Sequence, residues 1–168
     1  MSVILGIDIG GSTTKIVGLR GDQSVIGMQR VKAEDPITSL YGALGSFMTA
    51  HKLQLEDISR VVLTGVGASY VEGDIYGIPT TVVEEFTAVG TGGLALTGRQ
   101  KAVVVSMGTG TAFIWADNTT GERVHLGGSG IGGGTLAGLC SLLCGARQFD
   151  LVQKLSSQGD ISKIDLNV

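Results

Sequence analysis

The first hundred residues read as three strands followed by alternating helices and strands. Short apolar runs bounded by glycine, serine and polar turns predict strands, and these runs lie at residues 3–9, 15–19, 25–31, 61–63 and 80–83. Apolar side chains recur at helical spacing over residues 36–51 and again from about 82 to 96, which predicts two helices. Asp35 precedes Pro36 and is a suitable N-cap for the first of them.

The remaining residues repeat the beginning of this plan. Residues 3–27 and 103–127 share the order of strand, Gly/Ser/Thr turn, strand, polar turn and strand. The pattern predicts strands at 102–106, 111–116 and 123–126, a hairpin turn at 118–121, a glycine loop at 127–134, helices at 135–144 and 150–157, and a strand-like end at 164–168.

The element order predicts an α/β fold of the ribonuclease-H type, duplicated, with the order βββαβαβα in each copy. We expect a first subdomain at residues 1–98 and the N-terminal part of a second at 99–168, because the second series stops after βββα. An incomplete sheet exposes a strand edge, so we expect either a fragment of a longer protein or a partner that completes it.

Composition narrows the class of protein. Charged residues make up 16% and hydrophobic residues 43%, which excludes disorder, and 28 glycines without a Gly-X-Y period exclude collagen. A net charge of −3 with no basic patch argues against a nucleic-acid partner. Neither a signal peptide nor a sustained apolar span is visible, so we expect no membrane partner and a cytoplasmic location. Cys140 and Cys144, spaced i,i+4, are interpreted as buried packing thiols.

The turn at residues 8–15 carries the first candidate chemistry. Gly10 and Gly11 allow backbone N–H groups to form an anion-binding concavity, and the hydroxyls of residues 12–14 and the charge of Lys15 add donors. Asp8 at the strand end suits Mg²⁺, which takes one or two carboxylates together with phosphate oxygens. A tight hairpin with a structural role is the alternative.

A matching turn occupies residues 107–111, and two such turns on facing subdomains would grip one polyphosphate from both sides. The glycine loop at 127–134 then leads into the helix that begins at Thr135, and a helix N-terminus favours phosphate. A flexible linker is the alternative interpretation of that loop.

Two acids and one arginine are further candidates. Residues 81–84 fit a capping box that would occupy Glu84, which leaves Glu85 as the freer carboxylate and a candidate general base. Arg123 could bind a carboxylate through its planar guanidinium, although a solvated hairpin residue is an equal alternative.

These motifs resemble those of a known family. DIGGSTTK at residues 8–15 resembles the first phosphate loop of the acetate-kinase/sugar-kinase/Hsp70/actin superfamily. A more specific resemblance, to type II pantothenate kinases, rests on TGVGA at 64–68, EEF at 84–86, SMGTG at 106–110, RV at 123–124 and GGGTLAGL at 132–139.

The resemblance implies an actin-like ATPase fold and transfer of the γ-phosphoryl group of ATP, with Mg²⁺, to pantothenate at the start of coenzyme A synthesis. It implies that Glu85 is the catalytic base, that Asp8 holds the metal, and that the substrate contacts Arg123, Thr109 and Gly67. The implied nucleotide-binding residues are Gly10, Gly11, Ser12, Thr13, Lys15, Gly108, Gly110, Gly132, Gly133, Gly134 and Thr135. It also implies a homodimer, an acyl-CoA as feedback inhibitor, and a chain that is C-terminally truncated.

Other interpretations remain open. An activator of acyl-CoA dehydratases has the same fold but needs cysteines that share an iron–sulfur cluster, and a sugar kinase more often has an aspartate as its base. A non-catalytic module that binds a nucleotide or an acyl-CoA is the third alternative.

Overall fold

The computed structural model describes residues 2–32 and 35–163, so the predicted strand-like end at 164–168 lies outside the described residues. The chain divides into two compact units, Met1–Arg99 and Gln100–Val168, and each is described by itself.

The first unit is built on a sheet of five strands in the order β3-β2-β1-β4-β5, counted over its described residues. The strands are β1 (Val3–Ile9), β2 (Thr13–Arg20), β3 (Val25–Lys32), β4 (Ile58–Thr64) and β5 (Thr80–Val82). The meander β1–β3 is antiparallel, whereas β4 runs parallel to β1 and β5 runs parallel to β4. The carboxyl ends of β1 and β4 therefore meet at one edge of the sheet.

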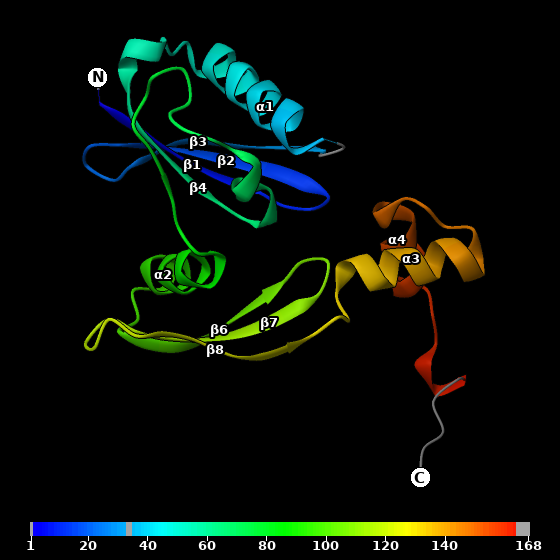
Figure 1. Ribbon diagram of the computed structural model, residues 1–168. Coiled ribbons are helices and arrows are strands. Elements are labelled where there is room, and N and C mark those ends of the chain that lie inside the picture. The colour runs from blue at the N-terminus through cyan, green and yellow to red at the C-terminus, as the bar shows by residue number, and fades with distance from the viewer. Residues whose placement is uncertain (1, 33–34, 164–168) are drawn as a thin grey trace. The chain divides into compact units, whose positions relative to one another are not determined.

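Helix α1 (Pro36–His51) covers one face of this sheet (Figure 1). Asp35 is its N-cap and accepts a hydrogen bond from the N–H of Thr38 at 2.7 Å, which confirms the predicted helix start. Along β1, residues at odd positions are buried in the core while Ile4, Gly6 and Asp8 face the other side. The core cluster includes Leu5, Ile7, Leu40, Leu44, Phe47 and Leu63, with Val66–Tyr70 (η2) beside it.

Helix α2 (Glu85–Thr97) begins later than predicted. The N–H of Val83 donates to the carbonyl of Leu63 at 2.8 Å, which keeps residue 83 beside β4 and delays the first helical turn. The predicted capping box at residues 81–84 is therefore wrong: Glu84 is itself the N-cap, and its carboxylate accepts from the N–H of Thr87.

The second unit contains β6 (Lys101–Met107), β7 (Thr111–Asp117), β8 (Arg123–Ser129), α3 (Gly133–Cys144) and α4 (Phe149–Ser157). The unit also contains the short 3-10 turn η3 (Ile161–Lys163), whereas the 3-10 turns η1 (Leu55–Asp57) and η2 belong to the first unit. Strands β6–β8 form an antiparallel sheet, and Ile114 and Ala116 are buried on one face of it. The predicted loop at 127–134 is wrong for its first residues, because Gly128 and Ser129 pair with β7.

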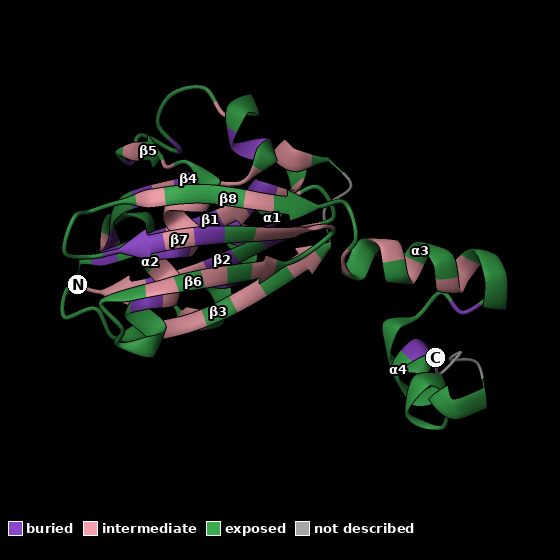
Figure 2. Ribbon diagram, turned by 90° about the horizontal axis from the view of Figure 1, so that it is seen from below, coloured by how far each residue is buried: buried purple, intermediate pink, exposed green. Residues whose placement is uncertain are grey.

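The cysteine prediction is also wrong. Helix α3 has no fully buried residue among those described, as Figure 2 shows, and Cys144 is exposed while Cys140 is half-buried. Four leucines of α3 are 47–80% exposed, so the apolar character of the helix does not translate into burial in this chain. None of the described helices combines the length and apolar character that a membrane crossing requires.

Candidate functional site

The carboxyl end of β1 carries an ion pair between adjacent strands. Asp8 and Lys15 are partners in the β1–β2 register, and Lys15 Nζ lies 2.6 Å from Asp8 Oδ2. The Asp8 side chain is 31% exposed and the Lys15 side chain 55%, so both can be reached from solvent. A charged pair thus stands at the base of the glycine turn.

The turn between β1 and β2 offers backbone donors. The N–H of Gly10 already donates to the carbonyl of Thr13 at 3.0 Å. Gly11 and Ser12 are exposed, and the described residues supply no acceptor for their amides. These two amides, rather than that of Gly10, are the ones available to an anion.

The hydroxyls of residues 12–14 point to different places. Ser12 is exposed and Thr13 is half-buried, but Thr14 is fully buried on the face that packs against α1. The expectation that Thr14 adds a donor for an anion is therefore wrong, because alternate residues of a strand face opposite sides of the sheet.

The carboxyl end of β4 closes against this turn. Gly65 has a φ of +87°, and a Cβ there would collide with Asp8 Oδ1 and the carbonyl of Ile9. Gly67 is buried, and a Cβ there would collide with Ile9. Close packing on β1 is thus a sufficient reason for glycine at 67, whether or not a substrate also approaches it.

A pocket of about 820 Å³ lies on the sheet face opposite α1. Its walls are mostly apolar side chains of β1–β4, and Thr87, Ala88 and Thr91 of α2 line it as well. Its lining also includes Asp8, Lys15 and Thr64, which come from the edge where β1 and β4 end. The volume is in the range of small-molecule pockets.

The two acids before α2 differ in their contacts. The carboxylate of Glu84 is engaged with the N–H of Thr87 at 2.7 Å. Glu85 is exposed in the first helical turn, and the described residues supply no hydrogen bond or ion pair to its carboxylate. Glu85 is therefore the acid that can accept a proton from a ligand.

In the second unit the turn at 108–110 packs directly on the start of α3. The N–H of Gly133 donates to the carbonyl of Gly108 at 2.8 Å. A Cβ at Gly110 would lie 2.7 Å from the carbonyl oxygen of Ser129, and one at Gly132 would lie 2.6 Å from that of Gly110. Only glycine permits this approach.

The start of α3 has the form of an anion site. Its N-cap is Gly132, which has no side chain to satisfy the first amides. The hydroxyl of Thr135 donates to the carbonyl of Gly130 at 2.7 Å and so braces the loop. Thr109 is exposed on the neighbouring turn. Uncapped amides and the helix dipole together favour a negative charge here.

Arg123 lies at the other end of the same sheet. It is the first residue of β8, whereas Ser129 at the last position pairs with Thr111 beside the glycine turn. Six residues of extended chain separate these ends, about 20 Å. The guanidinium donates to the carbonyls of Asp117 and Glu122 and to Asn118 Oδ1, so it secures the hairpin. The structure does not bring Arg123 and Thr109 together.

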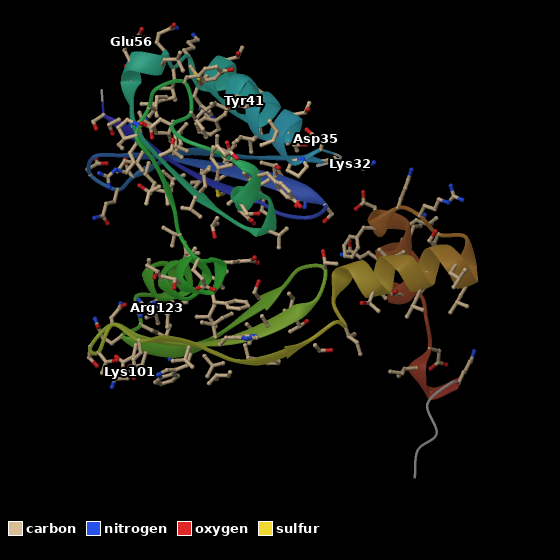
Figure 3. All side chains as sticks on the ribbon, in the orientation of Figure 1. Lys32, Asp35, Tyr41, Glu56, Lys101 and Arg123 are labelled. Carbon is tan, nitrogen blue, oxygen red and sulfur yellow. The ribbon has the colours of Figure 1, made fainter. Side chains whose placement is uncertain are left out.

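The same hairpin holds a buried carboxylate that the sequence did not single out. Asp117 is only 3% exposed, accepts from the N–H and hydroxyl of Thr119, and lies 3.0 Å from Lys101 Nζ. The Thr119 hydrogen bonds and Lys101 hold the pKa of Asp117 well below its ordinary value. Figure 3 shows Lys101 and Arg123 at one end of the β6–β8 sheet.

Thr64, the first residue of the TGVGA motif, was assigned no role of its own from the sequence. It follows the apolar run of β4 and pairs with Asp8. Its hydroxyl is buried without a hydrogen-bond partner in the described chain, and only its position at a strand end next to that of Asp8 signals this in the sequence.

The residues at this edge fit a magnesium ion. Asp8 offers one partly exposed carboxylate beside donors suited to phosphate, which is the environment Mg²⁺ uses when it binds together with a nucleotide. No cluster of three or more His, Cys, Asp or Glu side chains that could hold a metal ion occurs in the described residues. A metal site there would therefore need ligands from water or from a bound phosphate as well.

Comparisons with known proteins identify relatives of this chain. Residues 101–168 match the family described as Fumble. A protein named type II pantothenate kinase from Staphylococcus epidermidis is 30% identical over 98% of this chain, which spans 58% of that relative. The chain therefore covers little more than half the length of this relative.

Solved structures show the fold. Component A of (R)-2-hydroxyglutaryl-CoA dehydratase from Acidaminococcus fermentans matches with a TM-score of 0.74 at 14% identity. The match covers 95% of this chain and 60% of the component A chain. The activator of 2-hydroxyisocaproyl-CoA dehydratase from Clostridium difficile, solved with bound ADPNP, matches with a TM-score of 0.68 at 15% identity. The match covers 96% of this chain and 69% of the activator chain. The predicted ribonuclease-H-like, actin-like ATPase fold is confirmed, and over nearly its whole length this chain resembles the type II pantothenate kinases.

Proposed function

We propose that the protein to which this chain belongs is a kinase that phosphorylates pantothenate with ATP, the first step of coenzyme A synthesis. The observation that carries the proposal is the 30% identity to a protein named type II pantothenate kinase along 98% of the chain. The ADPNP bound by a protein of the same fold supports ATP as the phosphoryl donor.

In this proposal Glu85 is the general base. The primary hydroxyl of pantothenate loses its proton to the Glu85 carboxylate as its oxygen forms a bond to the γ-phosphorus. The bond from that phosphorus to the bridging oxygen breaks, and ADP leaves with the electron pair. The exposure of Glu85, and the engagement of Glu84 in the helix cap, support this division of roles.

The nucleotide phosphates are assigned to donors in both units. In the first unit the amides of Gly11 and Ser12, the hydroxyl of Thr13 and the ammonium of Lys15 are the proposed contacts, and Gly10 shapes the turn. In the second unit the amides at the start of α3, Gly134 and Thr135, are proposed, while Gly108, Gly110, Gly132 and Gly133 form the supporting turn. Asp8 would hold Mg²⁺, which neutralises charge that develops on the phosphates.

The substrate contacts are the finer part of the proposal. Thr109 is proposed to contact pantothenate through its exposed hydroxyl, and Gly67 through its backbone. Arg123 is proposed to bind the carboxylate, for which its guanidinium must give up hairpin acceptors such as Asn118 Oδ1. A homodimer, feedback inhibition by an acyl-CoA and a cytoplasmic location accompany this function and stay predictions.

A second candidate is an activator of an acyl-CoA dehydratase. Cys140 and Cys144 lie one helical turn apart and Cys144 is exposed, so this thiol is accessible to a cluster shared between subunits. Identity to the dehydratase component and the dehydratase activator of this fold is 14–15%, against 30% for the protein named type II pantothenate kinase, which favours the kinase. Anaerobic reconstitution with iron and sulfide separates the two: a stable visible absorbance that Cys144→Ser abolishes would favour the activator.

The kinase proposal is tested by transfer of a labelled γ-phosphoryl group. The protein is incubated with γ-labelled ATP, Mg²⁺ and pantothenate, and the products are separated by chromatography. Label in 4'-phosphopantothenate supports the proposal. ATP bound by the protein with no label transferred to pantothenate would count against it.

A further inference from the structure

Asp8 lies between two candidate donors on neighbouring strands. In the strand order β2-β1-β4, Lys15 is its partner on one side and Thr64 its partner on the other. Paired strands lie about 4.8 Å apart. All three residues line the same pocket, so their side chains share the face of the sheet opposite α1.

The two neighbours are used differently in this structure. Lys15 Nζ holds Asp8 Oδ2 at 2.6 Å. The hydroxyl of Thr64 is buried and has no hydrogen-bond partner in the part of the chain described, although Thr64 is the register partner of Asp8. A buried hydroxyl without a partner is costly, and such a group in a native structure calls for a reason.

The segment that follows Thr64 is fitted closely to Asp8. Gly65 adopts a left-handed φ of +87°, and any side chain there would collide with Asp8 Oδ1 and the carbonyl of Ile9. The end of β4 is therefore fixed next to the carboxylate. A rotation about the χ1 angle of Thr64 turns its hydroxyl in a new direction.

We propose that Thr64 is a positioning residue for Asp8, whose carboxylate receives the Thr64 hydrogen bond when it leaves Lys15 to hold a metal–nucleotide complex. The inference rests on the proposed function, which assigns Asp8 to the metal and Lys15 to the phosphates. A polyphosphate attracts the Lys15 ammonium away from Asp8, and the carboxylate then needs another donor to keep its orientation. Thr64 is the neighbouring donor whose hydroxyl is unused.

The effect of such a residue falls on metal affinity. Removing a hydrogen bond that orients a metal ligand typically costs 10–100-fold in affinity for the metal. The quantity to measure is the gain in ADP affinity that Mg²⁺ provides, which is the ratio of the dissociation constants without and with Mg²⁺. A general loss of stability would not change this ratio selectively.

The experiment compares variants by calorimetric titration with ADP, with and without Mg²⁺. Thr64→Val keeps the shape of the side chain and removes the hydroxyl, and Thr64→Ser keeps the hydroxyl. Thr14→Val is the matched control, because Thr14 also has a buried hydroxyl without a partner in the described chain but faces α1 on the opposite side of the sheet. Asp8→Asn tests the metal assignment itself.

We expect Thr64→Val to reduce the Mg²⁺-dependent gain about tenfold or more, while Thr64→Ser and Thr14→Val keep it. The melting temperature of metal-free Thr64→Val should equal or exceed that of the parent chain, since the change removes an unsatisfied hydroxyl.

Three outcomes would overturn the inference, and each of them contradicts a different claim. If Asp8→Asn loses the gain but Thr64→Val keeps it, Thr64 has no positioning role and the proposed function stands. An equal loss in Thr64→Val and Thr14→Val means that any buried hydroxyl matters in the same way. If Asp8→Asn keeps the gain, the metal assignment in the proposed function fails together with the inference. Should Thr64→Val be too unstable to titrate, Thr64→Ala is compared with Thr64→Ser on the same ratio.

Discussion

The carboxylate of Glu84 accepts a hydrogen bond from the N–H of Thr87 at 2.7 Å. Glu84 directly precedes Glu85, the residue that we propose as the base. Glu84 is thereby the N-cap of α2, and it fixes the first turn from which Glu85 projects. Two adjacent acids therefore differ in their contacts: Glu84 caps the helix, whereas Glu85 is exposed and is the acid that we propose as the base.

This relationship predicts that Glu84 contributes to stability. Glu84→Ala removes the cap, and loss of an N-cap costs about 1 kcal/mol. For a chain of this size that corresponds to a fall in melting temperature of about 2–4 °C. Thermal unfolding followed by circular dichroism measures the change. Glu84→Asp keeps a good N-cap and is the control. If Glu84→Ala loses more turnover than the Glu85 variant does, the roles of the two acids have been exchanged.

The glycines of the first unit differ in how closely an added side chain would meet its neighbours. Gly67→Ala places a methyl group against Ile9 in the core, and overpacking of this kind costs about 1–3 kcal/mol. Gly11→Ala meets no atom within contact distance, so it should leave the melting temperature unchanged and weaken binding of Mg-ATP. Calorimetry on both variants checks this contrast. Equal melting temperatures for the two would show that Gly67 is not held by packing.

Arg123 allows a direct comparison of hairpin and substrate roles. If it binds the carboxylate of pantothenate, Arg123→Ala should raise KM for pantothenate about tenfold or more, the value of a charge-assisted hydrogen bond, and leave the Kd of ATP unchanged. Asn118→Ala removes one of its hairpin acceptors and is the matched control. A lowered melting temperature in both variants with an unchanged KM would assign Arg123 to the hairpin alone.

Asp117 predicts a pH dependence of stability. Its pKa in the folded chain is lowered from the ordinary 3.8, by Thr119 first and also by Lys101. A lowered folded pKa gives stabilisation that is fully present above the ordinary pKa and is lost as the pH falls through the folded value. Asp117→Asn should therefore melt below the parent chain at pH 7, and the difference should shrink as the pH falls below 4.

The control for this pH series is Asp22, whose pKa is also lowered, by its hydrogen bonds from Ser24. Asp22 is exposed, so Asp22→Asn should melt close to the parent chain at both pH values. A difference between parent and Asp117→Asn that does not change with pH would show that the carboxylate charge is not the stabilising element.

Much of the fold could be predicted because strand and helix periods leave a direct trace in the sequence. The run at Val3–Ile9 was predicted with its observed bounds, and Asp35 with Pro36 marked the start of α1. The start of α2 was missed because a tertiary contact sets it: the N–H of Val83 pairs with Leu63 rather than entering a helix. Local pattern cannot report such a contact.

Burial and partners were the harder part of the candidate site. Thr14 and Lys15 are neighbours in the sequence, yet one faces the core and the other the pocket, and only the strand register decides which. The cysteines of α3 were expected to be buried because the helix is apolar, but no described element covers Cys144. Whether the Thr64 hydroxyl has a hydrogen-bond partner depends on the atoms around it, and the sequence does not reveal these.

The most direct test of the central claim is the rate of pantothenate-dependent ADP release from Mg-ATP, measured on this chain and on its Glu85→Gln variant. Our account predicts ADP release that requires pantothenate and falls more than about a hundredfold in Glu85→Gln, as expected when a general base is lost, while ATP binding is retained. ADP release that ignores pantothenate, or an equal rate in the two proteins, would contradict it.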